Sequence, residues 1–336
     1  MNNLKKAAVL VVTALVMMLA VAGCAKDEKG TSETSEASSS AVAVKNALGE
    51  DVEIKSSPKR VVALPVWAAE MAIDLAGTDR IVAVSPWIDD SDVSPLYEKA
   101  QEIKERVQSK DAEKILALQP DLVLLDTFND YDGSLSATLK EAGITVLTLA
   151  SPVSFEEIAD RLDTLSKALF VPEKGQQIIK EMNQRLDAVK QKVEGVEQKV
   201  KVLFYEDQYS SDGKSTGMLS AYGKGSTFDA IAQAAGVINV CTAENYSPVS
   251  RETVVNEWKP DLIVVPGIWY DGKSSVNDKG AGLIEAIKKD SMLRTLPAIQ
   301  NNRIIALTEK YRGSTTHYMA YAVEELAKAC YPDLFN

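Results

Sequence analysis

A long helical stretch, residues 154–196, constrains this chain more than any other feature of its sequence. Ser154, followed three residues later by Glu157, forms a capping-box pattern that predicts a helix start. Apolar residues then recur at helical spacing, Pro172 suits the first turn of a second helix, and Gly195 suits its end. That second helix would span on the order of 35 Å, about the width of a small domain. We expect it to bridge two separate halves of the chain.

The chain is long enough for two domains that each have a core. It has 336 residues, of which 46% are hydrophobic and 25% are charged. Its formal net charge of -11 argues against nucleic acid as a partner. Three cysteines are too few for a disulfide framework. We expect Cys241 and Cys330 to be buried thiols, with a disulfide between them as the alternative.

The N-terminal segment, residues 1–23, has the pattern of a signal peptide. Lys5 and Lys6 precede an apolar run that is too short to span a membrane comfortably, and small residues follow it. A cysteine directly after Ala-Gly, here Cys24, resembles the bacterial lipobox, which implies cleavage before this cysteine and its lipidation. The alternative is a plain secretory signal with an incidental cysteine. The polar residues 24–44 predict a disordered tether that keeps the folded body outside the membrane but close to it.

The two halves that flank the helical bridge share one plan. In residues 45–153 and again in residues 197–336, continuous apolar runs alternate with helical segments, which predicts parallel, doubly wound sheets. Pro120-Asp121 leads into a strand in the first half, and Pro260-Asp261 leads into one in the second. We therefore predict an α/β fold with two Rossmann-like lobes, similar in architecture.

Five stretches carry a resemblance to a known family: residues 59–64 (KRVVAL), 78–85 (TDRIVAVS), 112–124 (AEKILALQPDLVL), 139–144 (LKEAGI) and 322–327 (AVEELA). They resemble the substrate-binding proteins of ABC importers for iron chelates, haem and cobalamin, over nearly all of the chain from about Lys45. The resemblance implies two lobes joined by one long rigid helix, with the ligand held in the cleft between them. It also implies an extracytoplasmic, monomeric binding protein rather than an enzyme, with an ABC permease and its ATPase as partners.

Members of this family dock on their permease through one glutamate in each lobe. The resemblance carries this role to Glu113 and Glu252. Glu113 lies seven residues before Pro120, whereas Glu252 lies eight residues before Pro260, so that Thr253 stands at the motif position. Glu252 is therefore the weaker assignment. The alternative for both is an acid that favours the start of a helix without any further role.

The ligand is expected beyond the carboxyl ends of the parallel strands, where the loops of both lobes meet. Three of the four tryptophans fall in such loops, and rings of this size favour a large, partly apolar ligand. Lys224 and Asp207 are further charged residues in these loops. The predicted ligand-binding residues are Trp67, Trp87, Asp89, Phe128, Tyr131, Tyr205, Glu206, Tyr209, Tyr222, Trp269, Tyr270, Tyr311 and Arg312.

A ferric siderophore is the ligand that we expect first, with a corrinoid or haem as alternatives. The loops lack an arginine cluster, which argues against a strongly anionic complex, while the loop tryptophans favour a corrinoid. A tyrosine phenolate could bind haem iron. We expect no resident cofactor or metal, because His317 is the single histidine and lies beside the last helix, where a packing or capping role is expected.

A remote alternative is a P-loop ATPase, because residues 267–274 fit the Walker A spacing and follow a strand. Trp269 and Tyr270 are bulky where the backbone would have to wrap a phosphate, and Asp271 would repel that phosphate. The residues that follow predict turns instead of the helix N-terminus that a phosphate requires.

Overall fold

The computed structural model describes residues 41–209, 215–270 and 274–336, which belong to one compact unit. The predicted signal peptide (residues 1–23), Cys24 and the predicted tether up to residue 40 lie outside the described residues. Within the described ranges, no helix is long and apolar enough to cross a bilayer.

The last residues of the predicted tether form a strand. β1 (Val42–Lys45) pairs antiparallel with β2 (Asp51–Ile54), and Val44 is buried in the core of the N-terminal lobe. The prediction of disorder up to residue 44 is therefore wrong for residues 42–44. The reason is that one face of the pair, with Val44 of β1 and Ile54 of β2, is buried against that core.

The N-terminal lobe is built on a parallel sheet with the strand order β5-β4-β3-β6-β7. Its core strands are continuous apolar runs that are buried on both faces, as the sequence predicts. The strands are β3 (Val61–Ala63), β4 (Ile81–Val84), β5 (Glu105–Arg106), β6 (Leu122–Asp126) and β7 (Thr145–Leu149). The helices are α1 (Val66–Ala76), α2 (Tyr97–Ala100), α3 (Ala112–Ala117) and α4 (Ser134–Glu141).

The C-terminal lobe repeats this parallel sheet and extends it. Strands β10, β8, β12 and β15 are parallel neighbours. The sequence did not predict the two antiparallel pairs, of β9 with β8 and of β11 with β9. The strands are β8 (Lys201–Tyr209), β9 (Ser215–Tyr222), β10 (Ile238–Asn239), β11 (Tyr246–Pro248), β12 (Leu262–Val265), β13 (Ile268–Tyr270), β14 (Ser275–Asn277) and β15 (Ile304–Ala306). The helices are α7 (Thr227–Ala234), α8 (Arg251–Thr253), α9 (Ala281–Lys289), α10 (Pro297–Gln300), α11 (Glu309–Arg312) and α12 (Met319–Cys330).

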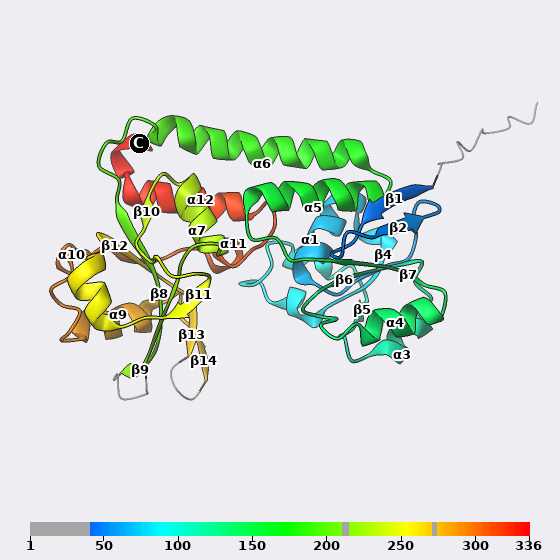
Figure 1. Ribbon diagram of the computed structural model, residues 1–336, viewed down its shortest axis with the longest axis horizontal. Coiled ribbons are helices and arrows are strands. Elements are labelled where there is room, and N and C mark those ends of the chain that lie inside the picture. Colours follow the sequence, from blue (N-terminus) through cyan, green and yellow to red (C-terminus); the bar gives the residue numbers. More distant parts are fainter. Residues whose placement is uncertain (1–40, 210–214, 271–273) are drawn as a thin grey trace, which may run out of the picture. The chain divides into compact units, whose positions relative to one another are not determined.

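Two helices, α5 (Phe155–Ala168) and α6 (Pro172–Val193), connect the lobes. The Oγ of Ser154 accepts a hydrogen bond from the backbone N–H of Glu157 (3.2 Å), whose side chain accepts one from the backbone N–H of Val153 (2.8 Å). The predicted cap is therefore present. Its second hydrogen bond comes from the N–H of Val153 instead of from that of the N-cap residue Ser154. Figure 1 shows α6 running over both lobes, packed on α5 at one end and on α12 at the other.

The two lobes share the backbone conformation that leads into their central strands. Gln119 and Lys259, each directly before a Pro-Asp pair, both have positive φ, 48° and 46°. The carboxylate of Asp121 accepts a hydrogen bond from the backbone N–H of Arg60 (2.9 Å), and that of Asp261 accepts one from the backbone N–H of Lys201 (3.0 Å). Each aspartate thus ties the start of one strand to the start of its neighbour. These equivalent contacts confirm the shared architecture.

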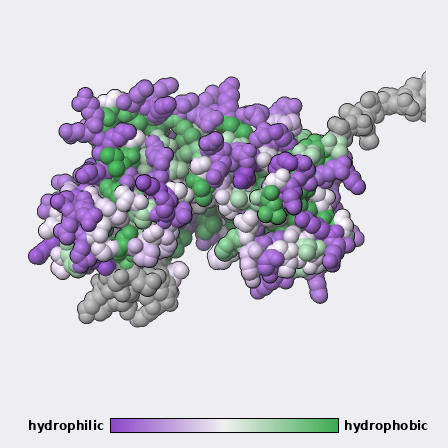
Figure 2. Space-filling model, viewed as in Figure 1, coloured by the Kyte–Doolittle hydropathy of each residue, from purple (hydrophilic) through white to green (hydrophobic). Residues whose placement is uncertain are grey.

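Cys241 and Cys330 are buried free thiols, as expected. Burial raises the pKa of the Cys330 thiol to about 12, which makes it unreactive at neutral pH. Figure 2 shows that hydrophilic residues cover most of the face in view, α6 included, while apolar residues gather beneath this helix.

Candidate functional site

A cavity of about 270 Å³ lies at the carboxyl ends of β3, β4 and β6, between the two lobes. The N-terminal lobe supplies most of its wall, and the segment after α11 in the C-terminal lobe closes it on the opposite side. This is where ligands bind in folds with parallel sheets. The lining residues are Leu64, Pro65, Val66, Trp67, Glu70, Ser85, Trp87, Val93, Asp126, Phe128, Asn129, Gly313, Ser314 and Thr315.

Asp126, the last residue of β6, holds one wall of this cavity in place. Its buried carboxylate accepts hydrogen bonds from Trp67 Nε1 (3.2 Å), from Ser151 Oγ (3.0 Å) and from the backbone N–H groups of Phe128 (3.1 Å) and Asn129 (2.7 Å). One carboxylate thereby fixes an indole ring and the turn of a loop. Asp126 is not among the residues predicted from the sequence, although an acid at the end of a buried strand was the available signal.

Two exposed rings stand at the cavity. Trp87 is 70% exposed and Phe128 is 84% exposed, and both belong to loops that leave strand ends. Trp67 also lines the cavity, but it is only 6% exposed and packs mainly within its own lobe. Two exposed rings that stand together at one cavity suit contact with a large apolar ligand.

Glu70 lies in the wall of the cavity on α1 and is 2% exposed. Its carboxylate accepts a hydrogen bond from Thr316 Oγ1 (3.3 Å), which belongs to the C-terminal lobe. Burial raises the pKa of Glu70 to about 8, although hydrogen bonds with Ser94 and Thr316 act in the opposite direction. Glu70 is not among the residues predicted from the sequence, since a glutamate inside an apolar helix is ordinarily exposed.

The other predicted residues of the N-terminal lobe do not line the cavity. Asp89 makes a two-pronged ion pair with Arg106 (2.7 and 2.8 Å), and the hydrogen bonds from Arg106 lower the pKa of Asp89. Its carboxylate is thus already paired within its own lobe. Tyr131 is 86% exposed and lies farther along the loop that carries Phe128.

In the C-terminal lobe, the described residues that were predicted to bind ligand lie outside the cavity. Tyr205 is 1% exposed and packs in the lobe's core, which corrects the expectation that its ring faces the cleft. Trp269 donates a hydrogen bond to Asp278 (3.0 Å) and packs on the same core. The side chains of Asp207, Tyr209 and Tyr270 lie outside the described residues, and Lys224 is exposed.

Tyr222, Glu206, Tyr311 and Arg312 are also engaged within the C-terminal lobe. The hydroxyl of Tyr222 donates to Glu206 (2.7 Å), and burial beside that carboxylate raises the pKa of Tyr222. Arg312 is buried, pairs with Glu309 (2.5 Å) and lies over the ring of Phe228. Tyr311 stacks on Tyr321 with ring centroids 4.9 Å apart. These groups stabilise the lobe instead of pointing into the cavity.

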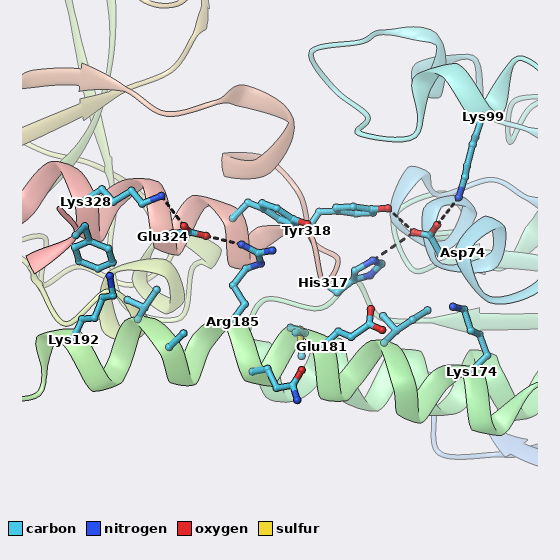
Figure 3. Close-up of a pocket in the computed structure, with 17 residues that line it drawn as sticks. Asp74, Lys99, Lys174, Glu181, Arg185, Lys192, His317, Tyr318, Glu324 and Lys328 are labelled. Atoms are coloured by element: carbon cyan, nitrogen blue, oxygen red, sulfur yellow. Dashed lines mark hydrogen bonds and ion pairs between the residues drawn. The ribbon is translucent and has the colours of Figure 1, made fainter. Parts of the chain in front are cut away.

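A larger cavity of about 840 Å³ lies along α6, between this helix, α12 and α1 (Figure 3). Several of its charged side chains pair with one another: Glu324 with Arg185 (2.5 Å) and with Lys328 (2.6 Å), and Asp74 with Lys99 (3.2 Å). Among the described residues that line it, none comes from the carboxyl end of a strand. We therefore place the ligand site in the smaller cavity, in spite of the difference in volume.

The two glutamates with a predicted docking role occupy equivalent positions. Glu113 is the second residue of α3 after its N-cap Asp111, and Glu252 is the second residue of α8 after its N-cap Ser250; both side chains are exposed. A π-helical turn over 254–258 follows α8 and accommodates one additional residue. This insertion accounts for the spacing of eight residues in the second lobe against seven in the first.

The part of the Walker-like segment that the structure describes does not form a strand-to-helix loop. β13, which covers residues 268–270 of this segment, pairs antiparallel with β14, and the next helix, α9, begins only at Ala281. A P-loop needs a helix N-terminus directly after its lysine. The geometry therefore does not support the ATPase alternative.

Comparison with known proteins agrees with this architecture. The sequence model of the family described as periplasmic binding protein matches residues 61–311. The chain belongs to this family. It is 26% identical to YvrC, an ABC transporter substrate-binding lipoprotein of Bacillus subtilis, over 99% of this chain and 100% of the relative. It is 25% identical to a vitamin B12-binding protein of Vibrio parahaemolyticus, over 80% of this chain and 88% of the relative.

Solved structures show the same fold. The periplasmic haem-binding protein RhuT of Roseiflexus sp. RS-1 superposes with a TM-score of 0.66 at 23% identity, over 82% of this chain and 99% of RhuT. The protein is thus a two-lobed substrate-binding protein of the ABC-importer type that works outside the cytoplasm. This family consists of transport proteins that bind substrates.

Proposed function

We propose that this periplasmic binding protein captures a corrinoid and delivers it to an ABC permease. The observation that carries the proposal is the composition of the cavity wall. Among its described lining residues there is no lysine, arginine or histidine, while Trp67, Trp87 and Phe128 supply rings, and Ser85 and Asn129 supply polar groups. Such a wall suits a large apolar ring system whose edges carry neutral amides.

Because the described wall contains no cation, it suits a neutral corrinoid better than the two anionic candidates, haem and a catecholate siderophore complex. Haem carries carboxylates, and a catecholate siderophore complex carries several negative charges. Either would lie beside Asp126 with no described cation in the wall to compensate, which is unfavourable in a partly buried site. The amide groups of a corrinoid can instead hydrogen-bond with hydroxyls, with Asn129 and with carboxyl groups. A neutral or cationic ferric siderophore is the second candidate for the same reason.

Relatives support this choice of ligand. The Vibrio parahaemolyticus relative is a vitamin B12-binding protein, and a relative from Halobacterium salinarum, 24% identical over 96% of this chain, is a cobalamin-binding protein. The cavity of about 270 Å³ would hold one edge of a corrinoid, and the exposed rings of Trp87, Phe128 and Tyr131 would extend the contact surface beyond it.

The test is a competition among ligand classes with the purified protein. We expect cyanocobalamin to quench tryptophan fluorescence with a Kd below about 1 µM. Haemin, a ferric catecholate and a neutral ferric hydroxamate should bind at least tenfold more weakly. Tight binding of haemin or of the catecholate, with no response to cyanocobalamin, would contradict the proposal. A preference for the hydroxamate would establish the second candidate.

We further propose that the protein acts as a monomer held to the membrane by a lipid on Cys24. In cells labelled with palmitate, the natural protein should carry the label and sediment with membranes, whereas Cys24→Ser should lose both properties. Cys241→Ser is the matched control, since Cys241 is a buried thiol of the folded body. Membrane association that survives Cys24→Ser would argue against this anchor.

A further inference from the structure

The two lobes touch at a second place besides α6, which we call the α1 seam. It consists of Glu70 and Asp74 on α1 and of residues 314–318 in the C-terminal lobe. Thr316 Oγ1 donates to Glu70 Oε2 (3.3 Å), and the hydroxyl of Tyr318 donates to Asp74 Oδ2 (2.7 Å). Figure 3 shows Tyr318 and His317 both pointing at Asp74.

The seam continues into the wall of the ligand cavity. Ser314 and Thr315 line this cavity from the C-terminal side. The hydroxyls of Ser314 and Thr316 are hydrogen-bonded (2.8 Å), and the backbone N–H of Thr316 donates to Ser314 Oγ (3.2 Å). The position of Ser314 therefore depends on Thr316, whose hydroxyl is hydrogen-bonded to the Glu70 carboxyl.

Glu70 is fully enclosed at this junction. It lies against Ser94 and Thr316, both of which are completely buried, and no described lysine, arginine or histidine forms an ion pair with it. Burial raises the pKa of this carboxyl to about 8, so it keeps its proton at neutral pH. The ionised form would be a buried, unpaired charge close to Asp74, and it would have to attract water to become stable.

Four other groups that can carry charge or titrate belong to this region. Asp74 stays ionised at neutral pH: its burial acts to raise its pKa, but hydrogen bonds from His317, Tyr318 and Lys99 outweigh burial and the pKa is lowered. Burial, together with Asp74, raises the pKa of Tyr318, which keeps its hydroxyl neutral. His317 and Lys99 face Asp74 and not Glu70.

We propose that Glu70 is a positioning residue whose neutral carboxyl holds segment 314–316 in place as the C-terminal wall of the ligand cavity, so that ligand capture weakens in alkaline solution. This inference rests on the proposed function, because it concerns the same cavity. Loss of the proton places a charge between α1 and segment 314–316. Water that enters to solvate this charge separates the two and removes Ser314 and Thr315 from the ligand.

The first experiment is a pH profile of cyanocobalamin affinity between pH 6 and pH 9.5. For the natural protein, affinity should be constant up to about pH 7.5 and should then fall, by about tenfold between pH 8 and pH 9.5. Glu70→Gln keeps a neutral hydrogen-bonding group at every pH, so its affinity, whatever its value at pH 6, should show no fall up to pH 9.5. Glu70→Ala should bind more weakly at every pH.

His317→Gln is the control, because it removes the side chain that faces Asp74 beside Tyr318 in the same seam and leaves Glu70 in place. We expect it to keep the alkaline fall in affinity. A flat profile for the natural protein would overturn the inference. A fall that survives in Glu70→Gln, or disappears in His317→Gln, would overturn it as well.

A second measurement needs no ligand. Hydrogen–deuterium exchange of the peptide that contains residues 313–318 is compared between the natural protein and Glu70→Gln at the same pH. Above pH 8 the natural protein should exchange at least threefold faster, while at pH 6 the two should agree. If cyanocobalamin fails to bind at any pH but this difference is present, the proposed ligand is wrong and the role of Glu70 is upheld. Equal exchange at every pH overturns the role of Glu70.

Discussion

Replacing both Trp87 and Phe128 with alanine should weaken cyanocobalamin binding by at least about a hundredfold. Each ring is exposed in the free protein and stands at the cavity, so it becomes buried only when ligand is present. Burial of one aromatic side chain contributes roughly 1.5–3 kcal/mol, so the loss of two rings corresponds to about 3 kcal/mol or more. That free energy converts to roughly two orders of magnitude in Kd.

The same change should leave folding intact, because exposed side chains contribute little to the core. The thermal unfolding midpoint of the double variant should stay within about 2 °C of the natural value. Leu48→Ala is a matched control: Leu48 is a large apolar residue, 81% exposed, in the turn between β1 and β2. An affinity that changes equally in the control, or not at all in the double variant, would show that these rings do not bind the ligand.

The sequence predicted the architecture well because the signals for strands and caps are local. The apolar runs, the cap at Ser154 and the paired Pro-Asp motifs each depend on a few neighbouring residues. It also placed Trp67, Trp87 and Phe128 at the cavity, since loops after parallel strands meet at one edge of a sheet.

The C-terminal half of the site was less predictable for a physical reason. Whether a loop side chain faces a ligand depends on which partners its own lobe supplies, and these partners are distant in sequence. Trp269 donates a hydrogen bond to Asp278, and the ring of Tyr205 is buried in the core of its lobe. Glu70 and Asp126 illustrate the reverse case, because their importance comes from contacts with Thr316 and Trp67 that no local pattern reveals.

Reversing the charge of Glu113 should abolish uptake of ligand by cells and leave the affinity of the purified protein unchanged within about twofold. Glu113 lies in the first turn of α3, is exposed, and is absent from the wall of the ligand cavity. We propose that it meets a cation on the permease, so that Glu113→Lys replaces an attraction with a repulsion at the docking surface. Charge reversal across an interface disfavours the complex by several kcal/mol. Lost affinity for ligand would place Glu113 at the binding site instead.

Glu252→Lys should reproduce this loss of uptake, whereas Thr253→Lys should not. The seven-residue spacing before the proline, which selects Glu113 in the first lobe, selects Thr253 before Pro260. The position after the helix N-cap selects Glu252 instead, because the π-helical turn over 254–258 inserts one residue between Glu252 and the proline. Thr253 is also engaged locally, since its backbone N–H and its hydroxyl both contact Ser250 Oγ (3.0 Å each). Glu156→Lys is the matched control, because Glu156 is an exposed first-turn acid on α5, which lies beside α6 and not beside α3 (Figure 1). If the control abolishes uptake as well, the effect belongs to any acid at a helix start, and docking through one glutamate in each lobe loses its support.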